Sequence, residues 1–406
     1  MDGDVCKKER LFTLSYILLC VASFLTSFSF FLLVPTLPFY LTEVFDVEPH
    51  LVGVVLSCYV VAVLCVRPFA GFVADLFPRK RVYIASYIMF ALAFIGYLGI
   101  KSSLAIFVVL RVFHGFAFGS LTTAANTLVI DVMPSSRRGE GLGYYGVMNN
   151  LAMAFGPMAG LFVVSSSGYT SLFVMAVVSA LSGLLFAQFV KTANRAICSA
   201  ATTSVLSTDR FFLSAGIPAC VALMLLAVPY GMTTSYMAMY ANNIGLTTDT
   251  GLFFTIMAFG LIVSRLFSGK RVDKGYITST IRNGMFIAFW GVLGEALLSF
   301  FADYDITVAY VIYFVSALFI GYGFGTMFPA FNTLFVNLAP NSRRATATAT
   351  YLTGWDVGIG MGMLLGGALG NGSFALSFTM GTLLVVLSTL FFIFYAAPHF
   401  NKNRLR

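Results

Sequence analysis

Long apolar runs separated by short polar segments continue through almost the whole sequence, and this pattern constrains the fold more than any other feature. A helix needs about 20 apolar residues to cross the roughly 30 Å hydrocarbon core of a bilayer. Of the 406 residues, 59% are hydrophobic and only 10% are charged, which is more apolar surface than a soluble domain buries. We therefore predict an all-α membrane protein without a separate catalytic domain.

The hydropathy pattern predicts twelve transmembrane helices. The first run follows a basic N-terminal segment and is too long for the core of a signal peptide, so we expect it to be retained as a span. The predicted spans are 12–40, 51–75, 82–100, 104–131, 139–165, 169–190, 211–241, 249–270, 277–300, 306–337, 343–369 and 374–397.

Basic residues are distributed unevenly between the two sides of this map. Of the 24 Lys and Arg, all but four fall on one side; Lys101 falls on the other, and Arg67, Arg111 and Arg265 fall inside spans. Since the number of spans is even, the positive-inside rule predicts that both termini are cytoplasmic. We expect a multi-pass plasma-membrane protein, in the inner membrane if the source is bacterial. The net charge of +8 comes from the loop clusters and indicates topology, not a nucleic-acid partner.

The two halves of the chain repeat each other. The stretch from Leu110 to Arg138 matches a stretch 206 residues further on, and a second match 198 residues apart covers part of spans 2 and 8. We predict two pseudo-symmetric six-helix bundles, 1–190 and 211–406, joined by a cytoplasmic linker at 191–210. Such repeats imply a transport site at the interface of the bundles, opened alternately to each side. The second match pairs Arg67, Gly71 and Asp75 with Arg265, Gly269 and Asp273.

Four short motifs carry a resemblance to a known family. They are Gly71 to Arg81 (GFVADLFPRKR) after span 2, Arg111 to Gly115 in span 4, Gly156-Pro157-Met-Ala-Gly160 in span 5, and Pro35-Thr-Leu-Pro38 at the end of span 1. Over essentially the whole chain, these motifs resemble the major facilitator superfamily, and within it the twelve-span drug:proton antiporter group. Leu76 and Pro78 depart from the loop signature, where a basic residue and a glycine are usual.

The resemblance implies roles for several of these residues. The loop signature implies a cytoplasmic gate, and the glycine-proline motif of Gly156, Pro157 and Gly160 implies antiport, although an ordinary helix kink at Pro157 is the alternative. The implied gating residues, with their repeat counterparts, are Arg67, Gly71, Asp75, Arg79, Lys80, Arg265, Gly269 and Asp273.

Three ionisable residues within spans are candidates for proton coupling. Arg111 lies about seven residues inside span 4, where a charge needs a partner or a cavity. His114 is one turn further on the same face, and a packed polar side chain is an equal interpretation. Asp356 is the only carboxylate near the middle of a span, and it lies on the side of span 11 away from glycines that recur every fourth residue. We expect Asp356 to bind and release a proton, with a structural hydrogen bond as the alternative. Glu295, nearer the outer end of span 9, is expected to reach the membrane–water interface.

By resemblance, spans 1, 4, 7 and 10 line a central cavity. Polar and aromatic side chains that enter it from spans 5, 7 and 11 are the predicted substrate contacts, although lipid-facing aromatic residues are equally expected in such a chain. The predicted contacts are Tyr230, Thr234, Tyr236, Asn150 and Trp355.

The function predicted from these features is proton-coupled efflux of a small amphipathic compound by alternating access. The first alternative is proton-coupled uptake of a sugar or another metabolite, and a receptor without transport is a distant one. An enzyme is not expected, because no nucleophile elbow, Walker loop or metal-ligand cluster is present in the sequence. The glycines from Gly321 to Gly325 lie in a long apolar span, which favours helix packing over the selectivity filter of a channel. We expect no cofactor and no metal; the partners are the substrate, protons and the bilayer, and the protein is expected to be a monomer.

Overall fold

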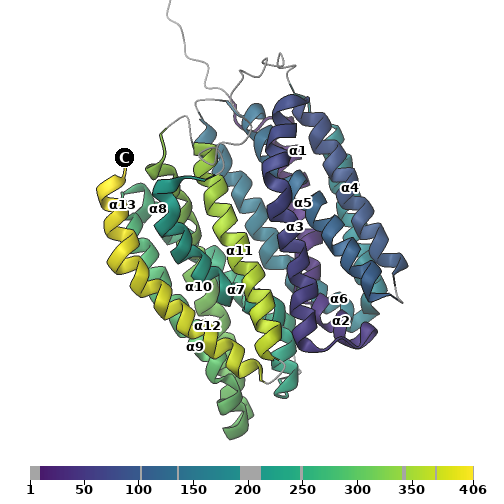
Figure 1. Ribbon diagram of the computed structural model, residues 1–406, viewed down its shortest axis with the longest axis vertical. Helices are drawn as coiled ribbons and strands as arrows, with labels where there is room; N and C mark the ends of the chain where they lie inside the picture. Colours follow the sequence, from purple (N-terminus) through teal and green to yellow (C-terminus); the bar gives the residue numbers. More distant parts are fainter. Residues whose placement is uncertain are drawn as a thin grey trace, which may run out of the picture.

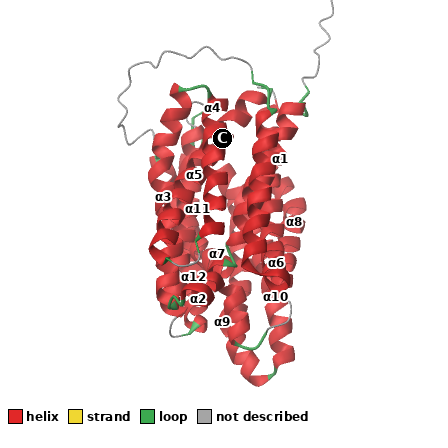
Figure 2. Cartoon of the chain, turned by 90° about the vertical axis from the view of Figure 1, so that its right-hand side faces the viewer, coloured by secondary structure: helices red, strands yellow, loops and turns green. Residues whose placement is uncertain are grey.

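The computed structural model describes residues 10–100, 103–134, 137–192, 212–246, 250–340, 344–370 and 373–405. Within these ranges the chain is helical and contains no strand, as Figure 2 shows. The N-terminal half comprises α1 (Leu14–Leu33), α2 (Leu37–Phe45), α3 (Pro49–Leu76), α4 (Arg79–Gly99), α5 (Leu104–Val132) and α6 (Arg138–Gln188). The C-terminal half comprises η3 (Ser214–Gly216), α7 (Ile217–Asn243), α8 (Thr250–Asp273), α9 (Ile277–Tyr304), α10 (Ile306–Leu338), α11 (Arg344–Gly370), α12 (Phe374–Phe391), η5 (Phe392–Ala396) and α13 (Ala397–Asn403).

The described helices account for twelve membrane spans. Eleven helical stretches of the described chain are long and apolar enough to cross a bilayer. One of them, α6, contains two spans, because Gly168 has a φ of 78° and a ψ of 178° and so interrupts the helical backbone. Glycine adopts this positive φ without the steric penalty that a Cβ atom would bring. Between the predicted spans 139–165 and 169–190, only Gly168 departs from helical geometry, and no loop separates them.

The first span differs from the prediction. We expected one helix over 12–40, but α1 ends at Leu33 and α2 begins at Leu37, with a turn at 34–36. Pro35 lies in this turn and Pro38 lies in the first turn of α2. A proline ring fixes φ and removes a backbone donor, so two prolines three residues apart favour a break here. The turn brings α1 and α2 to the wall of a small pocket described below.

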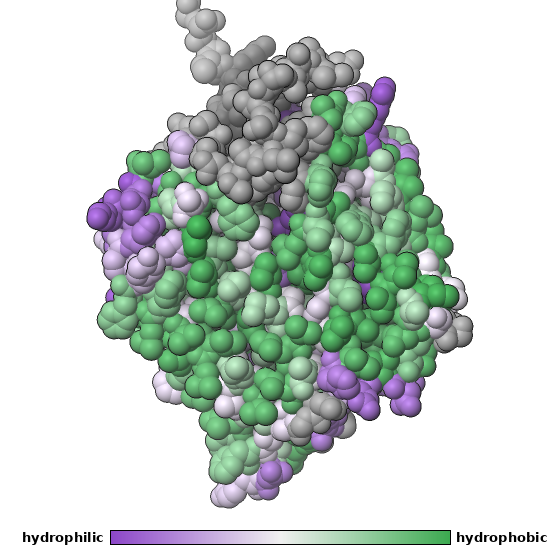
Figure 3. Space-filling model, viewed as in Figure 1, coloured by the Kyte–Doolittle hydropathy of each residue, from purple (hydrophilic) through white to green (hydrophobic). Residues whose placement is uncertain are grey.

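The outer surface of the molecule is apolar, as a bilayer requires. Large hydrophobic side chains point outward from the helices, among them Phe162, which is 69% exposed. Figure 3 shows hydrophobic residues over most of one face, with hydrophilic residues mainly toward its upper and lower ends. Since lipid tails solvate these side chains, helix contacts must come from close packing and polar bonds instead.

Both described ends of the chain lie at one end of the bundle, called here the terminal face. Figure 1 shows that α1 begins and α13 ends at the same, upper end. The backbone N–H of Lys191 donates to Ser15 at the start of α1, and that of Leu405 donates to the Asn337 carbonyl at the end of α10. Of the predicted linker 191–210, all but Lys191 and Thr192 lies outside the described residues, so its boundaries remain a prediction.

Two helix pairs join the halves. Within the N-terminal half α1, α3, α4, α5 and α6 pack on one another, and within the C-terminal half α7 to α12 do the same. Across the boundary, α3 packs on α11 and α6 packs on α8, with a smaller contact between α2 and α7. Figure 1 shows the yellow-green α11 beside the purple helices of the N-terminal half.

The glycines at every fourth position of α11 from Gly354 to Gly366 form the predicted seam against α7, and Gly370, the next in the series, meets Phe374 of α12. A Cβ atom at Gly354 would lie 2.6 Å from the Cys220 sulfur, and one at Gly366 would lie 2.7 Å from the Tyr236 ring. Gly358 and Gly362 meet the backbone of α7 in the same way. Small residues allow such close approach in lipid. Helix α11 is therefore fixed along one side to a helix of its own half.

The glycines of α10 also serve helix packing. Gly321 and Gly325 meet the α8 backbone at Met257 and Leu261, and Gly323 meets α9 at Ala288. Helix α10 is continuous from Gly321 to Gly325, so the carbonyl groups there accept backbone hydrogen bonds and do not line a pore. The packing interpretation of Gly321 to Gly325 is confirmed.

Candidate functional site

The interface of α3 and α11 contains the candidate site. The two helices run antiparallel and touch through their backbones on the side away from the terminal face. A Cβ atom at Gly53 would lie 2.6 Å from the Met363 carbonyl oxygen, and one at Gly367 would lie 2.6 Å from that of Pro49. The Ser57 hydroxyl is 3.2 Å from the Gly360 carbonyl. This half of the interface is closed by direct helix contact.

An ion pair crosses the interface further toward the terminal face. Arg67 Nη2 in α3 lies 2.6 Å from Asp356 Oδ2 in α11, and the two side chains are 18% and 22% exposed. Asp356 projects from α11 away from the glycine seam, so its carboxylate meets the other half of the protein. The sequence placed Arg67 in the gating motif and Asp356 in proton coupling; the structure brings the two residues together.

A second cluster lies next to this pair, and Tyr59 connects them. Tyr59 interacts electrostatically with Arg111, Asp356 and Arg67. The Arg111 guanidinium carbon lies 4.7 Å from the centre of the Tyr59 ring, within cation–π range. The Tyr59 side chain is fully buried, and its hydroxyl has no hydrogen-bond partner among the described residues. The Arg67–Asp356 pair and Arg111 therefore share one electrostatic environment.

Tyr97 links Arg111 to His114. The Tyr97 side chain hydrogen bonds with Arg111, and its hydroxyl oxygen lies 3.1 Å from His114 Nδ1. Because a guanidinium only donates, Tyr97 accepts from Arg111 and can turn its own proton toward the imidazole. The rings of Phe90 and Phe94 enclose His114, with centroids 5.2 Å and 4.8 Å away. Sequence reasoning missed Tyr59 and Tyr97, because nothing in their spacing separates them from the other tyrosines in the spans.

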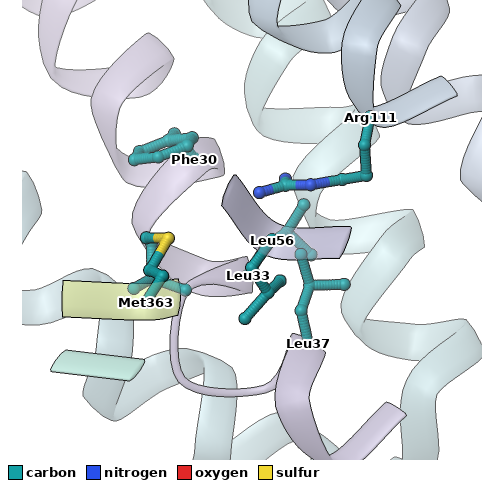
Figure 4. Close-up of a pocket in the computed structure, with 7 residues that line it drawn as sticks. Phe30, Leu33, Leu37, Leu56, Arg111 and Met363 are labelled. Atoms are coloured by element: carbon teal, nitrogen blue, oxygen red, sulfur yellow. The ribbon is translucent and has the colours of Figure 1, made fainter. Parts of the chain in front are cut away.

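Arg111 also faces a small apolar pocket at the break between α1 and α2. Figure 4 shows the guanidinium reaching toward Phe30 and lying beside Leu56, with Met363 of α11 across the pocket. The pocket thus joins four helices of the N-terminal half, α1, α2, α3 and α5, to α11 of the C-terminal half. It is lined by Phe30, Leu33, Val34, Leu37, Leu56, Arg111 and Met363.

Arg79 and Lys80, two of the predicted gating residues, lie at the terminal face. Arg79, at the start of α4, is bidentate to Asp131 near the end of α5, with Nη1 2.7 Å and 2.8 Å from the carboxylate oxygens. The Lys80 ammonium donates to the Gln188 carbonyl at 2.9 Å. Asp131 was not singled out from the sequence, although it stands six residues before the basic pair Arg137-Arg138.

The remaining gating residues are less fully described. The side chains of Asp75 and Asp273 lie outside what the structure describes. A Cβ atom at Gly71 or Gly269 would meet no atom within 4 Å among the described residues, so neither glycine is required by a close helix contact there. Arg265 of α8 has Tyr230 and Tyr351 as electrostatic neighbours.

The glycine-proline motif of α6 packs against α1. A Cβ atom at Gly156 would lie 2.6 Å from the Phe31 Cβ atom, and Gly160 faces the backbone of Leu32. Pro157 lies inside the helix between them. These close contacts keep α1 and α6 together within one half.

The predicted substrate contacts divide into two groups. The rings of Tyr230 and Trp355 lie 5.0 Å apart between centroids and are tilted by 48°, and the Phe328 ring lies 4.4 Å from that of Trp355. The three rings form an aromatic cluster in the C-terminal half. Thr234, Tyr236 and Asn150 are instead bonded to backbone carbonyls. The Tyr236 hydroxyl donates to Met363 at 2.8 Å.

A second, polar pocket lies within the N-terminal half. Ser23 and Ser27 of α1 both hydrogen bond to the Asn149 amide oxygen of α6. The space beside them is about 40 Å³, enough for an ordered water. The pocket is lined by Ser23, Thr26, Ser27, Tyr83, Leu121, Thr122, Ala125, Asn126, Tyr145 and Asn149.

Glu295 does not reach the membrane–water interface, contrary to the prediction. Helix α9 continues to Tyr304, nine residues beyond it, and the Glu295 side chain is fully buried. The Thr233 hydroxyl of α7 lies 2.7 Å from its carboxyl group, and Oε1 has no partner among the described residues. The sequence-based estimate was wrong because the helix extends further than the apolar run on which it relied.

Comparison with known proteins agrees with this architecture. The family model described as Major Facilitator Superfamily matches residues 19–362. Among solved structures, a D-xylose-proton symporter superposes with a TM-score of 0.76 at 16% identity, covering 95% of this chain and 98% of that one. The nucleoside transporter NupG superposes with a TM-score of 0.74 at 16% identity, over 93% and 99% of the two chains. At these identities the likeness concerns the fold alone.

Curated relatives include an export protein and resistance proteins. The Staphylopine export protein of Staphylococcus aureus is 23% identical over 365 residues, 86% of this chain and 88% of the relative. Multidrug resistance protein 3 of Bacillus subtilis is 28% identical over 138 residues, 34% of this chain and 27% of the relative. Quinolone resistance protein NorA of Staphylococcus aureus is 24% identical over 136 residues, 34% of each chain.

The helical fold, the family model and the curated relatives together define a membrane transporter, not an enzyme. The chain belongs to the major facilitator superfamily, and it carries small molecules across a membrane.

Proposed function

We propose that this transporter is a proton-driven exporter of a small amphipathic compound. The main observation that supports this proposal is the Arg67–Asp356 ion pair, which joins α3 of one half to α11 of the other. The named relatives support export over uptake, since one is an export protein and two are resistance proteins. The proposal places both termini in the cytoplasm of a bacterial cell and the protein in its inner membrane as a monomer.

In the proposed cycle, the charge on Asp356 sets the strength of the contact between the halves. The ionised carboxylate attracts Arg67 and holds α3 against α11. Protonation removes that attraction, so the halves separate more readily at this level. The charged or titratable neighbours of Asp356 are Arg67 and Tyr59 on α3 and Tyr351 on α11. A proton entering from the outer compartment would thus favour one orientation of the transporter, and its release inside would favour the other.

Arg111 and His114 would connect the substrate to this proton site. Arg111 interacts with Tyr59, which also interacts with Asp356, so charge at one position changes the energy of charge at the other. The aromatic cluster of Tyr230 and Trp355 offers an apolar surface for the compound on the C-terminal side. The Arg79–Asp131 pair and Lys80 would close the terminal face as the gate.

A transport assay with an imposed pH gradient tests the proposal. Purified protein in proteoliposomes should move an amphipathic fluorescent dye against the direction of the proton gradient, and collapse of the gradient should stop the movement. Asp356→Asn should remove the dependence on the gradient while retaining membrane insertion. Dye movement in the same direction as protons would identify a symporter, and wild-type gradient dependence in Asp356→Asn would reject the assigned proton site.

A further inference from the structure

Arg111 is a buried cation without a carboxylate partner. Its side chain is 2% exposed, and none of the ion pairs between described residues includes it. Its neighbours Tyr59 and Tyr97 are neutral groups, and its Nε and Nη1 atoms have no hydrogen-bond partner in the described part of the chain. A charge removed from water in this way is costly unless an anion accompanies it.

The unused donors belong to a side chain that lines the pocket between the halves. Figure 4 shows the guanidinium extending between Phe30 and Leu56. The other lining residues are apolar, and Met363 is the contribution of the C-terminal half. A group bound here would touch both halves, at about 10 Å along α5 from its first residue, Leu104.

From this geometry we propose that Arg111 is the binding site for an anionic group of the transported compound. A carboxylate or a similar oxyanion accepts from an unused N–H of Arg111. The aliphatic and aromatic lining contacts the apolar part of the same molecule once the pocket, about 10 Å³ in this conformation, widens as the halves move. The substrate class is therefore an organic anion with an apolar body. This inference rests on the proposed exporter function and makes its substrate more specific.

The proposal also explains how binding acts on the rest of the protein. An anion at Arg111 changes the electrostatic potential at Tyr59, which also interacts with Asp356 and Arg67. Substrate and proton then occupy neighbouring sites that influence each other through one buried ring. The apolar lining excludes water, which strengthens the guanidinium–anion interaction.

The test compares three probes that share an aromatic body. Naphthylacetate, naphthylethanol and naphthylmethylammonium are bound to the full-length purified protein in detergent, at constant ionic strength, by equilibrium dialysis. The acid should bind about tenfold more tightly than the alcohol, the difference expected for a charge-assisted bond, and the cation should bind least. Equal affinity for the acid and the alcohol overturns the proposal.

Variants locate the preference. Arg111→Gln should remove the difference between the acid and the alcohol, whereas Arg282→Gln, the same change at an exposed arginine of α9, should preserve it. Met363→Glu supplies an internal carboxylate across the pocket and should also remove the preference, so the test survives if Arg111→Gln fails to fold. A preference for the acid that persists in either pocket variant overturns the site.

Binding in detergent requires no proton gradient, so the two proposals fail separately. Gradient-driven dye export without any preference for the acid refutes the anion site alone. A preference that depends on Arg111, in a protein whose transport ignores the gradient, refutes proton-driven export alone.

Discussion

The two interfaces between the halves are equivalent by the internal repeat, yet they differ in chemistry. At α3·α11, Arg67 pairs with Asp356 at 2.6 Å. At α6·α8, the repeat places Arg265 at the position of Arg67 and Asn150 at that of Asp356. An amide cannot ionise, so of these two equivalent positions only Asp356 can bind a proton. Under the proposed function, this difference would make the α3·α11 interface the one that responds to the proton.

The two interfaces also differ in how closely the helices approach. A Cβ atom at Gly53 would lie 2.6 Å from an α11 carbonyl oxygen, whereas one at Gly251 of α8 would lie 3.6 Å from the Met158 carbonyl of α6. The second distance is ordinary van der Waals contact. The interface that carries the ion pair is thus also the one with the tighter backbone packing.

Reversing the charge at each interface should give the largest difference between them. Arg67→Glu places two carboxylates together and should lower gradient-driven dye transport about tenfold or more, because like charges replace an ion pair. Arg265→Glu should have a smaller effect, since the repeat counterpart of Asp356 is Asn150, which is not a carboxylate. Recovery of at least about threefold in the double variant Arg67→Glu/Asp356→Arg would support the pair itself. Equal loss in Arg67→Glu and Arg265→Glu would contradict the asymmetry.

Moving the carboxyl group to the other interface should restore part of the lost response. In an Asp356→Asn background, Asn150→Asp supplies an acid at the repeat-equivalent position in α6. We expect transport to regain a severalfold dependence on the pH gradient, below that of the wild type, because Arg265 stands at the position equivalent to Arg67. The measurement is the initial rate of dye transport with and without the gradient. A double variant as insensitive as Asp356→Asn would show that position within the repeat is not sufficient.

Adding one methyl group should disturb only the tighter interface. Gly53→Ala would force α3 from α11 and expose the outer part of the site, whereas Gly251→Ala should be tolerated. A cysteine at Ser57, which lies in the α3·α11 contact, reports the change through its rate of labelling by a membrane-impermeant thiol reagent. We expect labelling to rise severalfold with Gly53→Ala and less than about twofold with Gly251→Ala, as local openings follow small free-energy changes. Comparable rates in both variants would remove the distinction.

A carboxyl group away from both interfaces should have the smallest effect. Glu295 is buried within the C-terminal half and bonded to Thr233. Glu295→Gln preserves a hydrogen-bonding group of the same size, so gradient-driven transport should stay within about twofold of the wild type. Glu295→Ala should instead lower the midpoint of thermal unfolding, because it leaves a cavity. Loss of the gradient response in Glu295→Gln would make Glu295 a second proton carrier.

Much of the architecture was predictable because lipid imposes simple rules. The twelve spans follow from hydropathy, and the glycine spacing of α11 correctly predicted a packing face and an opposite face for Asp356. These features depend only on residues that are close in sequence. The break at Pro35 was visible as a motif, but its effect on the first span was not anticipated, because apolar length does not show where a helix stops.

The partners within the site were not predictable to the same degree. Periodicity assigned Arg67 to the face of α3 that also carries Gly71 and Asp75, but it could not show that α11 would present Asp356 to that face. Tyr59 and Tyr97 acquire their importance only from what three other helices place beside them. Which helices meet, and at what register, is decided by packing between segments that are far apart in sequence.

The glycine seam of α11 has a mechanical consequence. Since the backbone of α11 lies directly on α7, the two helices have little freedom to slide independently. In the proposed cycle, protonation of Asp356 would therefore move α11 and α7 together, and with them Trp355 and Tyr230 of the aromatic cluster. A larger residue at Gly358 should loosen the contact between α11 and α7, so that Asp356 still binds a proton while substrate transport is no longer coupled to it.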